Sequence, residues 1–322
     1  MVDAVWLALR EAQGGDGFWR QVVITTLDGM AGRGMYDHVA GGFFRYSTTR
    51  DWSIPHFEQM LEDNAGLLEV RAATGQSLGV RRYLVRDVLK YLNASLRQDD
   101  PPCWSGSQDA DEEYYAADAA GRARMTPPYI DRTMYVNWNG LAVRAHLAAA
   151  VALKTGQWAQ QALDTPSFVL ERCLSPDGSV HQYYLQGKAH LPGLLHDQVS
   201  VGHALLAAYQ CTGDQHWLRA SEDLARWCLD HLQSASGAFR DRLPAADDVG
   251  ALARPRYDLE DNSKLTRWFV ELDGHRPGRY LTEAKRALEA FAGDYRAYGL
   301  MAAAYALAVD DMLRAQGRPV LS

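Results

Sequence analysis

The sequence predicts an all-α protein, an (α/α)6-type toroid or barrel of antiparallel helix hairpins that is expected to be incomplete at its N-terminus. Three observations lead to this fold class. Apolar residues recur at three- and four-residue spacing, the segments between these stretches alternate between short and long, and the long segments resemble one another. We expect residues 1–322 to form a single domain of this kind.

Helical periodicity predicts eleven helices, each with its apolar residues along one face. Runs such as "GLAVRAHLAAAVALKTG" are rich in Ala and Leu, which are good helix formers. Eleven helices make five pairs and one odd helix, close to a six-hairpin toroid. The predicted ranges are 3–12, 18–32, 56–74, 79–97, 137–155, 157–173, 196–211, 215–233, 260–271, 278–291 and 295–315.

Short and long connections alternate along the chain. Alternate connections in an antiparallel array lie at opposite ends of the helices, so all the long loops would share one face, here called the loop face. A superhelical α-solenoid is the competing prediction, but solenoid repeats usually keep both connections short. The short connections lie near 13–17, 75–78, 156, 212–214 and 272–277, and the long ones near 33–55, 98–136, 174–195 and 234–259.

The long loops carry related sequences. In each, a small residue precedes an aromatic or β-type residue and then a polar cluster, at intervals of about sixty residues, which is a repeat signal. The segments are "GGFFRY" (41–46), "CWSGSQDADEEYY" (103–115), "PDGSVHQYY" (176–184) and "SGAFRDR" (236–242).

The composition excludes several classes of function. The chain has 47% hydrophobic and 23% charged residues, as soluble globular proteins do, and its 33 Lys and Arg are scattered within a net charge of −7, so we expect no nucleic-acid partner. No run of eighteen apolar residues predicts a membrane span. The absence of a signal-peptide pattern and of any C-x-x-C among the four Cys predicts a cytoplasmic protein with reduced thiols. The sequence contains no closely spaced His or Cys pairs of the kind that bind a metal ion, and we expect no cofactor.

The predicted helix starts on the loop face are unusually polar. Capping of free backbone N–H groups explains residues such as Asn139 and Asp261. It explains His56, Trp138 and His196 less well, because these side chains are larger than a cap requires. The starts read "PHFEQ" (55–59), "NWNG" (137–140), "LHDQ" (195–198) and "EDNS" (260–263).

Aromatic rings beside acids, amides and histidines suit a sugar ligand, because ring faces stack on C–H groups while polar side chains bond to hydroxyls. Packing of the loops on the helix ends is the alternative for any single ring. The predicted substrate-binding residues are Tyr36, Asp37, His38, Trp52, Trp104, Trp138, Asn139, His181, Asp197 and Asp241. Proton transfer near neutral pH favours His or a carboxyl group of shifted pKa, so the predicted catalytic residues are His56, Glu58, His196, Asp109 and Asp111.

The segment "QDADEE" (108–113) is superficially similar to the acidic D-x-D-D signature of terpenoid cyclases, which also use α/α barrels. A short acidic run is more often a solvated loop. A prenyl cavity would also be lined by apolar aromatic residues, whereas these loops are rich in His, Asp, Arg and Gln.

The stretch "GMYDHVAGGFFRYSTTRDWSIPHFEQMLEDNAGLL" (34–68) closely resembles the helical part of the thioredoxin-domain-containing family typified by spermatogenesis-associated protein 20. Further similar segments are "WSGSQDADEE" (104–113), "VNWNGLAVRA" (136–145), "LLHDQVSVGHALLAAY" (194–209) and, more weakly, "SGAFRD" (236–241) and "RPRYDLEDNSK" (254–264). The resemblance implies a six-hairpin α/α barrel related to sugar epimerases and glycosidases.

The chain also departs from that family. The sequence does not contain the thioredoxin domain or its Cys pair. We therefore expect either a homodimer or a separate thioredoxin-like partner. Gln59 and Glu62 stand where the family has Lys and Tyr, Gln198 and Val199 replace an aromatic–Ala pair, and the loop 114–135 is shorter.

Two hypotheses of function follow. The first is a carbohydrate-active enzyme with epimerase- or isomerase-like chemistry, in which His56 and either His196 or His181 transfer protons. The second is a non-catalytic binding or scaffold module derived from the barrel, motivated by the missing domain and by Gln59. A glycoside hydrolase using paired carboxylates and a terpenoid cyclase using Asp111 are weaker alternatives.

Overall fold

The computed structural model describes residues 2–14, 17–77, 82–245 and 247–317. The start of the helix predicted at 79–97, and parts of the connections predicted at 13–17, 75–78 and 234–259, lie outside these ranges. The chain divides into two compact units, which are described separately. Unit 1 comprises residues 1–16, 172–182 and 189–322, and unit 2 comprises residues 17–171 and 183–188.

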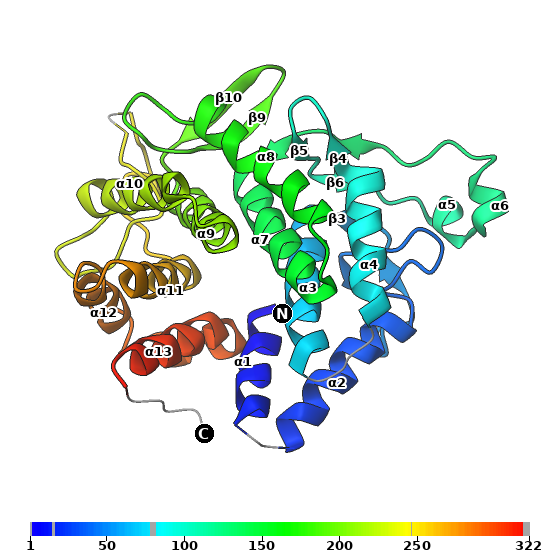
Figure 1. Ribbon diagram of the computed structural model, residues 1–322, viewed down its shortest axis with the longest axis horizontal. Helices are drawn as coiled ribbons and strands as arrows, with labels where there is room; N and C mark the ends of the chain where they lie inside the picture. The colour runs from blue at the N-terminus through cyan, green and yellow to red at the C-terminus, as the bar shows by residue number, and fades with distance from the viewer. Residues whose placement is uncertain (1, 15–16, 78–81, 246, 318–322) are drawn as a thin grey trace. The chain divides into compact units, whose positions relative to one another are not determined.

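Unit 2 is a group of helices with a long, partly stranded loop region (Figure 1). Helices α3 and α7 pack along each other, and α4 packs against both. Helices α3 and α7 bury small residues, such as Ala65 and Ala142, and small side chains permit close packing. The helices are α2 (Gly17–Gly32), α3 (Leu61–Ser77), α4 (Arg82–Tyr91), α5 (Glu112–Ala116), α6 (Ala119–Arg122), α7 (Val136–Leu153) and α8 (Gln157–Arg172).

Unit 1 is a second group of helices, in which α9 packs on α10 and α11, and α11 packs on α12 and α13. Gly202 in α9 allows the closest of these approaches, since a Cβ there would lie 2.1 Å from the Trp268 ring. Helix α1 is held to α13 by ion pairs from Arg10 to Asp310 and Asp311. The helices are α1 (Val2–Gln13), α9 (Leu195–Thr212), α10 (Gln215–His231), α11 (Leu259–His275), α12 (Leu281–Glu289) and α13 (Ala303–Ala315).

Three predicted helices differ in detail from the observed ones. The helix predicted from residue 56 begins at Leu61, because residues 55–60 form two short strands instead. The helix predicted at 79–97 continues beyond α4 as a π-helical turn, Leu92–Leu96, and the one predicted from 295 begins as a 3-10 segment, Tyr295–Ala302.

Short strands, which the sequence did not predict, tie the long loops together. Apart from β9 and β10, which have five residues each, these strands have two residues, too few positions to produce an alternating pattern. In unit 2, β1 pairs with β2, β4 with β5, β6 with both β3 and β7, and β8 with the Tyr183–Tyr184 part of β9. The strands are β1 (Tyr46–Ser47), β2 (Pro55–His56), β3 (Gln59–Met60), β4 (Arg97–Gln98), β5 (Cys103–Trp104), β6 (Ser107–Gln108), β7 (Ile130–Asp131), β8 (Met134–Tyr135), β9 (His181–Leu185) and β10 (Lys188–Pro192).

A repeated hydrogen-bond arrangement, here called the amide clamp, explains why the long loops resemble one another. In α3, the Asn64 side chain accepts the backbone N–H of Phe43 at 2.6 Å and donates to the Phe43 carbonyl at 2.9 Å. In α11, Asn262 does the same to Phe239, at 2.7 and 2.9 Å. Both amides are buried, so each clamp satisfies backbone groups that water does not reach.

The clamp occurs twice more. Asn139 of α7 binds both backbone groups of Trp104, and Gln198 of α9 binds those of Val180. Each of the four amides also donates to the carbonyl four residues earlier. The helix starts therefore share a tetrapeptide pattern that ends in the amide: LEDN (61–64), VNWN (136–139), LHDQ (195–198) and LEDN (259–262).

None of the described helices is both long enough and apolar enough to cross a membrane.

Candidate active site

The predicted residues His56 and Glu58 lie in a small charged cluster in unit 2. Pairing of β1 with β2 sets His56 opposite Tyr46, and the two rings stack with centroids 4.9 Å apart. The Glu58 carboxylate accepts from Arg45 Nη1 at 2.9 Å and lies 3.9 Å from His56 Nδ1. With Asp63, these residues form what we call the unit 2 cluster: Arg45, His56, Glu58 and Asp63.

Asp63, the third residue of the first LEDN segment, carries a shifted carboxyl group. Burial, with the neighbouring charges of Glu62 and Glu58, raises the pKa of Asp63 to about 6, and Arg45 opposes this rise. A carboxyl group of this pKa exchanges its proton near neutral pH.

Other predicted residues of unit 2 engage in internal contacts. The Asp37 carboxylate is 1% exposed, pairs with Arg122 at 2.7 Å and accepts the N–H of Val39. Asp111 caps α5 by accepting from Tyr114, and exposed Asp109 accepts from Ala110. Contacts of this kind give these carboxylates structural roles within the protein.

The predicted aromatic residues of unit 2 differ in exposure. Trp104 is fully buried between Arg97 and His146, with ring contacts of 4.6 and 4.4 Å. Trp52 packs against Gly29, where a Cβ would lie 2.7 Å from its ring.

Two further rings complete the predicted aromatic set of unit 2. Tyr36 is buried, donates to Asp87 and contacts the exposed His38 ring edge-on. Trp138 precedes the Asn139 clamp, rests on Tyr135 at 4.4 Å and remains half-exposed, so a ligand can reach it.

In unit 1, backbone hydrogen bonds bring three separate segments together. Leu195 at the start of α9 donates to the Asp241 carbonyl at 2.8 Å, and the Asp241 N–H donates to the Arg256 carbonyl at 2.9 Å. Leu194 also forms a β-bridge with Arg242. Asp241 is therefore fixed between the first turn of α9 and the residues that lead into α11.

Five titratable side chains surround this junction and form what we call the unit 1 cluster: His196, Asp241, Asp258, Asp261 and Lys264. His196 lies half-buried, with Nε2 3.4 Å from Oδ1 of the fully buried Asp197. Burial and the charge of Lys264 lower the pKa of His196, against the opposing effect of Asp241 and Asp258. The imidazole is therefore neutral at neutral pH and can accept a proton.

Asp261 is the acidic counterpart of His196. The cap of α11 is Asp258, which accepts from the N–H groups of Glu260 and Asp261, so Asp261 itself lies within the first turn. Burial and the neighbouring charge of Asp258 raise the pKa of Asp261 to about 7, with Lys264 opposing.

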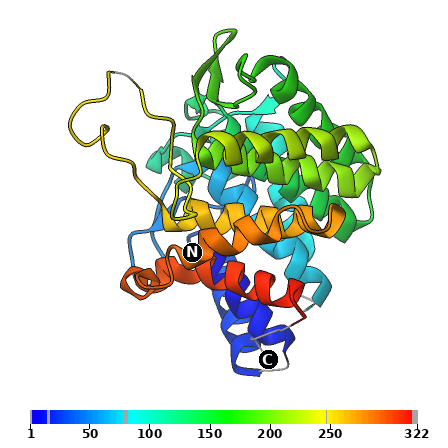
Figure 2. The same ribbon diagram turned by 90° about the vertical axis from the view of Figure 1, so that its left-hand side faces the viewer.

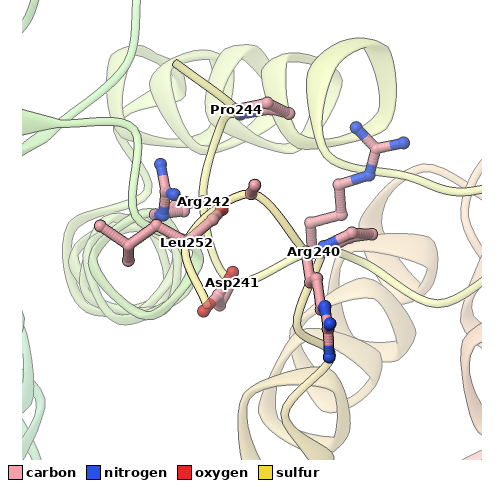
Figure 3. Close-up of a pocket in the computed structure, with 8 residues that line it drawn as sticks. Arg240, Asp241, Arg242, Pro244 and Leu252 are labelled. Carbon is pink, nitrogen blue, oxygen red and sulfur yellow. Dashed lines mark hydrogen bonds between the residues drawn. The ribbon is translucent and has the colours of Figure 1, made fainter. Parts of the chain in front are cut away.

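After α10 the chain forms a long loop between Asp241 and Asp258 (Figure 2). Residues of this segment line a pocket beside the unit 1 cluster. Figure 3 shows Arg240 and Arg242 extending to opposite sides of the strand-like segment that carries Asp241. The lining residues are Arg240, Asp241, Arg242, Pro244, Leu252, Ala253, Arg254 and Pro255.

The remaining predicted residue of unit 1, His181, hydrogen-bonds through Nδ1 to the Cys173 carbonyl at 3.0 Å. His56 and His196 belong to different units. Among the described residues, no group of three or more His, Cys, Asp or Glu side chains is arranged to hold a metal ion.

Sequence reasoning missed Asp63, Asp258 and Lys264, and it treated Asp261 as a capping residue. The signal that could have found both shifted carboxyl groups is the exact repeat of LEDN at 61–64 and 259–262.

Solved structures with this arrangement of helices include a sugar isomerase, a sugar epimerase and a glycoside hydrolase. A D-mannose isomerase matches with a TM-score of 0.74 at 10% identity, covering 97% of this chain and 86% of that one. Cellobiose 2-epimerase from Bacillus thermoamylovorans matches with a TM-score of 0.71 at 9% identity, covering 92% and 75%. A family 76 glycoside hydrolase (mannosidase) from Bacteroides thetaiotaomicron matches with a TM-score of 0.65 at 13% identity, covering 98% of this chain and 86% of that one. These likenesses confirm the all-α, (α/α)6-type fold class.

The curated relatives are spermatogenesis-associated protein 20 of mouse and human, which are 40% and 39% identical to this chain over 108 residues. The match confirms the resemblance predicted from the sequence. It covers 33% of this chain and 13% of the length of the mouse protein, so the chain aligns with only a small part of that relative. No family model matches the chain.

Proposed function

We propose that the protein is a sugar isomerase- or epimerase-like enzyme that moves a proton on the carbon beside a sugar carbonyl. One observation carries the proposal: within unit 1, an imidazole of lowered pKa and a carboxyl of pKa about 7 share Asp241, Asp258 and Lys264 as charged neighbours. At neutral pH this arrangement provides a base without a proton and a carboxyl group that is protonated in about half of the molecules.

The reaction needs two proton movements. The His196 imidazole accepts the proton from the carbon beside the carbonyl, while the Asp261 carboxyl donates its proton to the carbonyl oxygen, which gives an enediol. Return of a proton to the opposite face of the same carbon, while the former carbonyl oxygen gives its proton back to the Asp261 carboxylate, inverts that carbon. Return of the proton from His196 to the former carbonyl carbon, while the hydroxyl oxygen on the other enediol carbon loses its proton, isomerises the sugar. No electrons are gained or lost overall, so the step needs no external oxidant.

Other residues have supporting roles in this proposal. Asp197 orients His196 from its buried position, and Asp241 binds sugar hydroxyls beside it. In unit 2, His56 and Glu58 are a second candidate proton-transfer pair, with half-exposed Trp138 as a stacking surface. The solved isomerase and epimerase with this fold support the choice of reaction class.

The test is proton exchange with solvent. The protein is incubated in D2O with mannose, glucose, fructose and cellobiose, and NMR follows deuterium entering the carbon beside the carbonyl. We expect His196→Ala to lose about 100-fold or more in rate and Asp261→Asn to lose a similar amount. His216→Ala, an exposed histidine on α10, serves as the matched control and should keep the rate. Exchange that survives in His196→Ala, or is absent with every sugar, refutes the proposal.

A non-catalytic binding module is the second candidate, and one observation favours it. Asp37, Glu58 and Asp111 of unit 2 are each engaged in contacts within the protein. This candidate predicts saturable binding of a sugar without any deuterium incorporation.

A further inference from the structure

We propose that the pocket formed by residues 240–242, 244 and 252–255 binds an anionic substituent, a phosphate or a carboxylate, of the sugar on which the unit 1 cluster acts. The inference rests on the proposed function, because it names the substrate class of the same site. The pocket and the cluster share Asp241, which lines the pocket and whose charge acts on His196.

The charges of the pocket favour an anion. Three of its eight lining residues are arginines and one is an aspartate. Arg242 is already engaged: it pairs with Asp248 at 2.7 Å and donates to the carbonyls of Leu243 and Leu252. The Asp248 carboxylate therefore neutralises the charge of Arg242.

Arg240 and Arg254 are the available cations. Nε of Arg240 is buried and has no hydrogen-bond partner, an arrangement that a bound acceptor would satisfy. In the described part of the chain, neither guanidinium forms an ion pair. Guanidinium groups bind phosphate and carboxylate through paired N–H donors, which makes two unpaired arginines in one pocket a fitting anion site.

The size of the pocket indicates a substituent rather than a whole ligand. Its volume of about 150 Å³ is below the range of about 300–1,000 Å³ for sites that enclose a complete small molecule. The rest of the ligand would extend past Asp241 toward the first turns of α9 and α11. Asp241 disfavours an anion on its own side, so the charged group belongs beside Arg240 and Arg254.

The test measures binding by calorimetry at constant ionic strength, with glucose 6-phosphate, glucuronate, glucose and inorganic phosphate as probes. We expect glucose 6-phosphate or glucuronate to bind more tightly than glucose, and the stronger of the two identifies the substituent. Arg240→Gln and Arg254→Gln should each weaken that binding about tenfold or more while leaving glucose unaffected. Arg226→Gln, which removes one exposed charge of α10 outside the pocket, is the matched control and should change nothing.

Three outcomes overturn the proposal: no preference for either anionic sugar over glucose, unchanged binding in both arginine variants, or inorganic phosphate binding as tightly as both sugars. Arg254 is exposed, so its variant keeps the test valid if Arg240→Gln fails to fold. The two proposals can be tested separately, because His196→Ala should lose deuterium exchange but should still bind the anionic sugar.

Discussion

The tetrapeptide LEDN begins one helix in each unit, and the two copies have different surroundings. In both, the Asn clamps a Phe of the preceding loop and the Asp has a raised pKa, about 6 for Asp63 and about 7 for Asp261. After the clamped Phe, unit 2 continues with Phe44-Arg45-Tyr46, whereas unit 1 continues with Arg240-Asp241-Arg242.

This difference shows that the clamp fixes the backbone while the loop residues decide the chemistry. Phe44 is buried and Arg45 neutralises Glu58, so the unit 2 loop mainly stabilises its own structure. At the equivalent positions in unit 1, Arg240 borders a pocket and Asp241 borders His196.

The largest expected effect is in unit 2, at the buried ion pair. Asp37→Ala leaves the Arg122 guanidinium buried without its partner, so we expect a loss of about 3–5 kcal/mol in the free energy of unfolding, measured by urea denaturation. Arg226→Ala, which breaks an exposed pair with Asp223, should cost less than about 0.5 kcal/mol. If Asp37→Ala lowers the free energy of unfolding by less than about 1 kcal/mol, the ion pair is not important for stability, and Asp37 would again be a candidate for ligand binding.

The clamps should be equivalent in the two units. Asn64→Ala and Asn262→Ala each remove three hydrogen bonds and leave buried backbone groups unsatisfied, so each should cost about 2–4 kcal/mol in urea denaturation. Gln21→Ala, which removes one exposed hydrogen bond to Thr25, is the control. A large cost in only one unit would show that the two arrangements are not equivalent.

The two aspartates should make stability depend on pH. Each has a folded-state pKa above the unfolded value of 3.8, so the unfolded chain loses its proton first and stability falls as pH rises from about 4 through the folded pKa. Asp261→Asn removes this cost and should stabilise the protein by about 1 kcal/mol or more at pH 8.

The same substitution should have a smaller effect near pH 4, where the folded state holds the proton and the unfolded state still holds it in part of the molecules, and Asp63→Asn should stabilise less than Asp261→Asn. Urea denaturation at both pH values measures the difference. Equal effects of Asp261→Asn at pH 4 and pH 8 would contradict the raised pKa.

The smallest effects concern the cation beside each aspartate. Arg45→Ala breaks a half-exposed ion pair and should change the free energy of unfolding by about 0.5 kcal/mol. Because Arg45 and Lys264 each lower the pKa of the neighbouring aspartate, Arg45→Ala should raise the pKa of Asp63 and Lys264→Ala that of Asp261. Carboxyl NMR titration of both variants measures these changes, and a fall in either pKa would show that another charge dominates.

Much of the fold could be predicted because helices depend on local periodicity and on composition. Helices such as α7 and α9 carry long apolar faces, and their starts were found within a residue of the observed ones. The two-residue strands and the start of α3 could not be predicted, because they depend on hydrogen bonds to distant segments, as between Gln59 and Gln108.

The candidate site was predictable only in part. His196 and Asp241 were predicted from residue type and from their positions at a helix start and in a long loop. Asp261 was assigned to capping, because a capping residue and a buried first-turn carboxyl group look alike in sequence. Gln198, a departure from the family pattern, proved to be the amide of a clamp.

By itself, the sequence determined most of the helices, the alternation of short and long loops, and the amide repeated at four helix starts, because these depend on neighbouring residues. The tertiary structure decided which charged residues meet. The pKa of a carboxyl group depends on burial and on charges brought from distant segments, as Asp241 is brought to Asp261. The same four letters therefore begin a self-contained loop in one unit and border a charged pocket in the other.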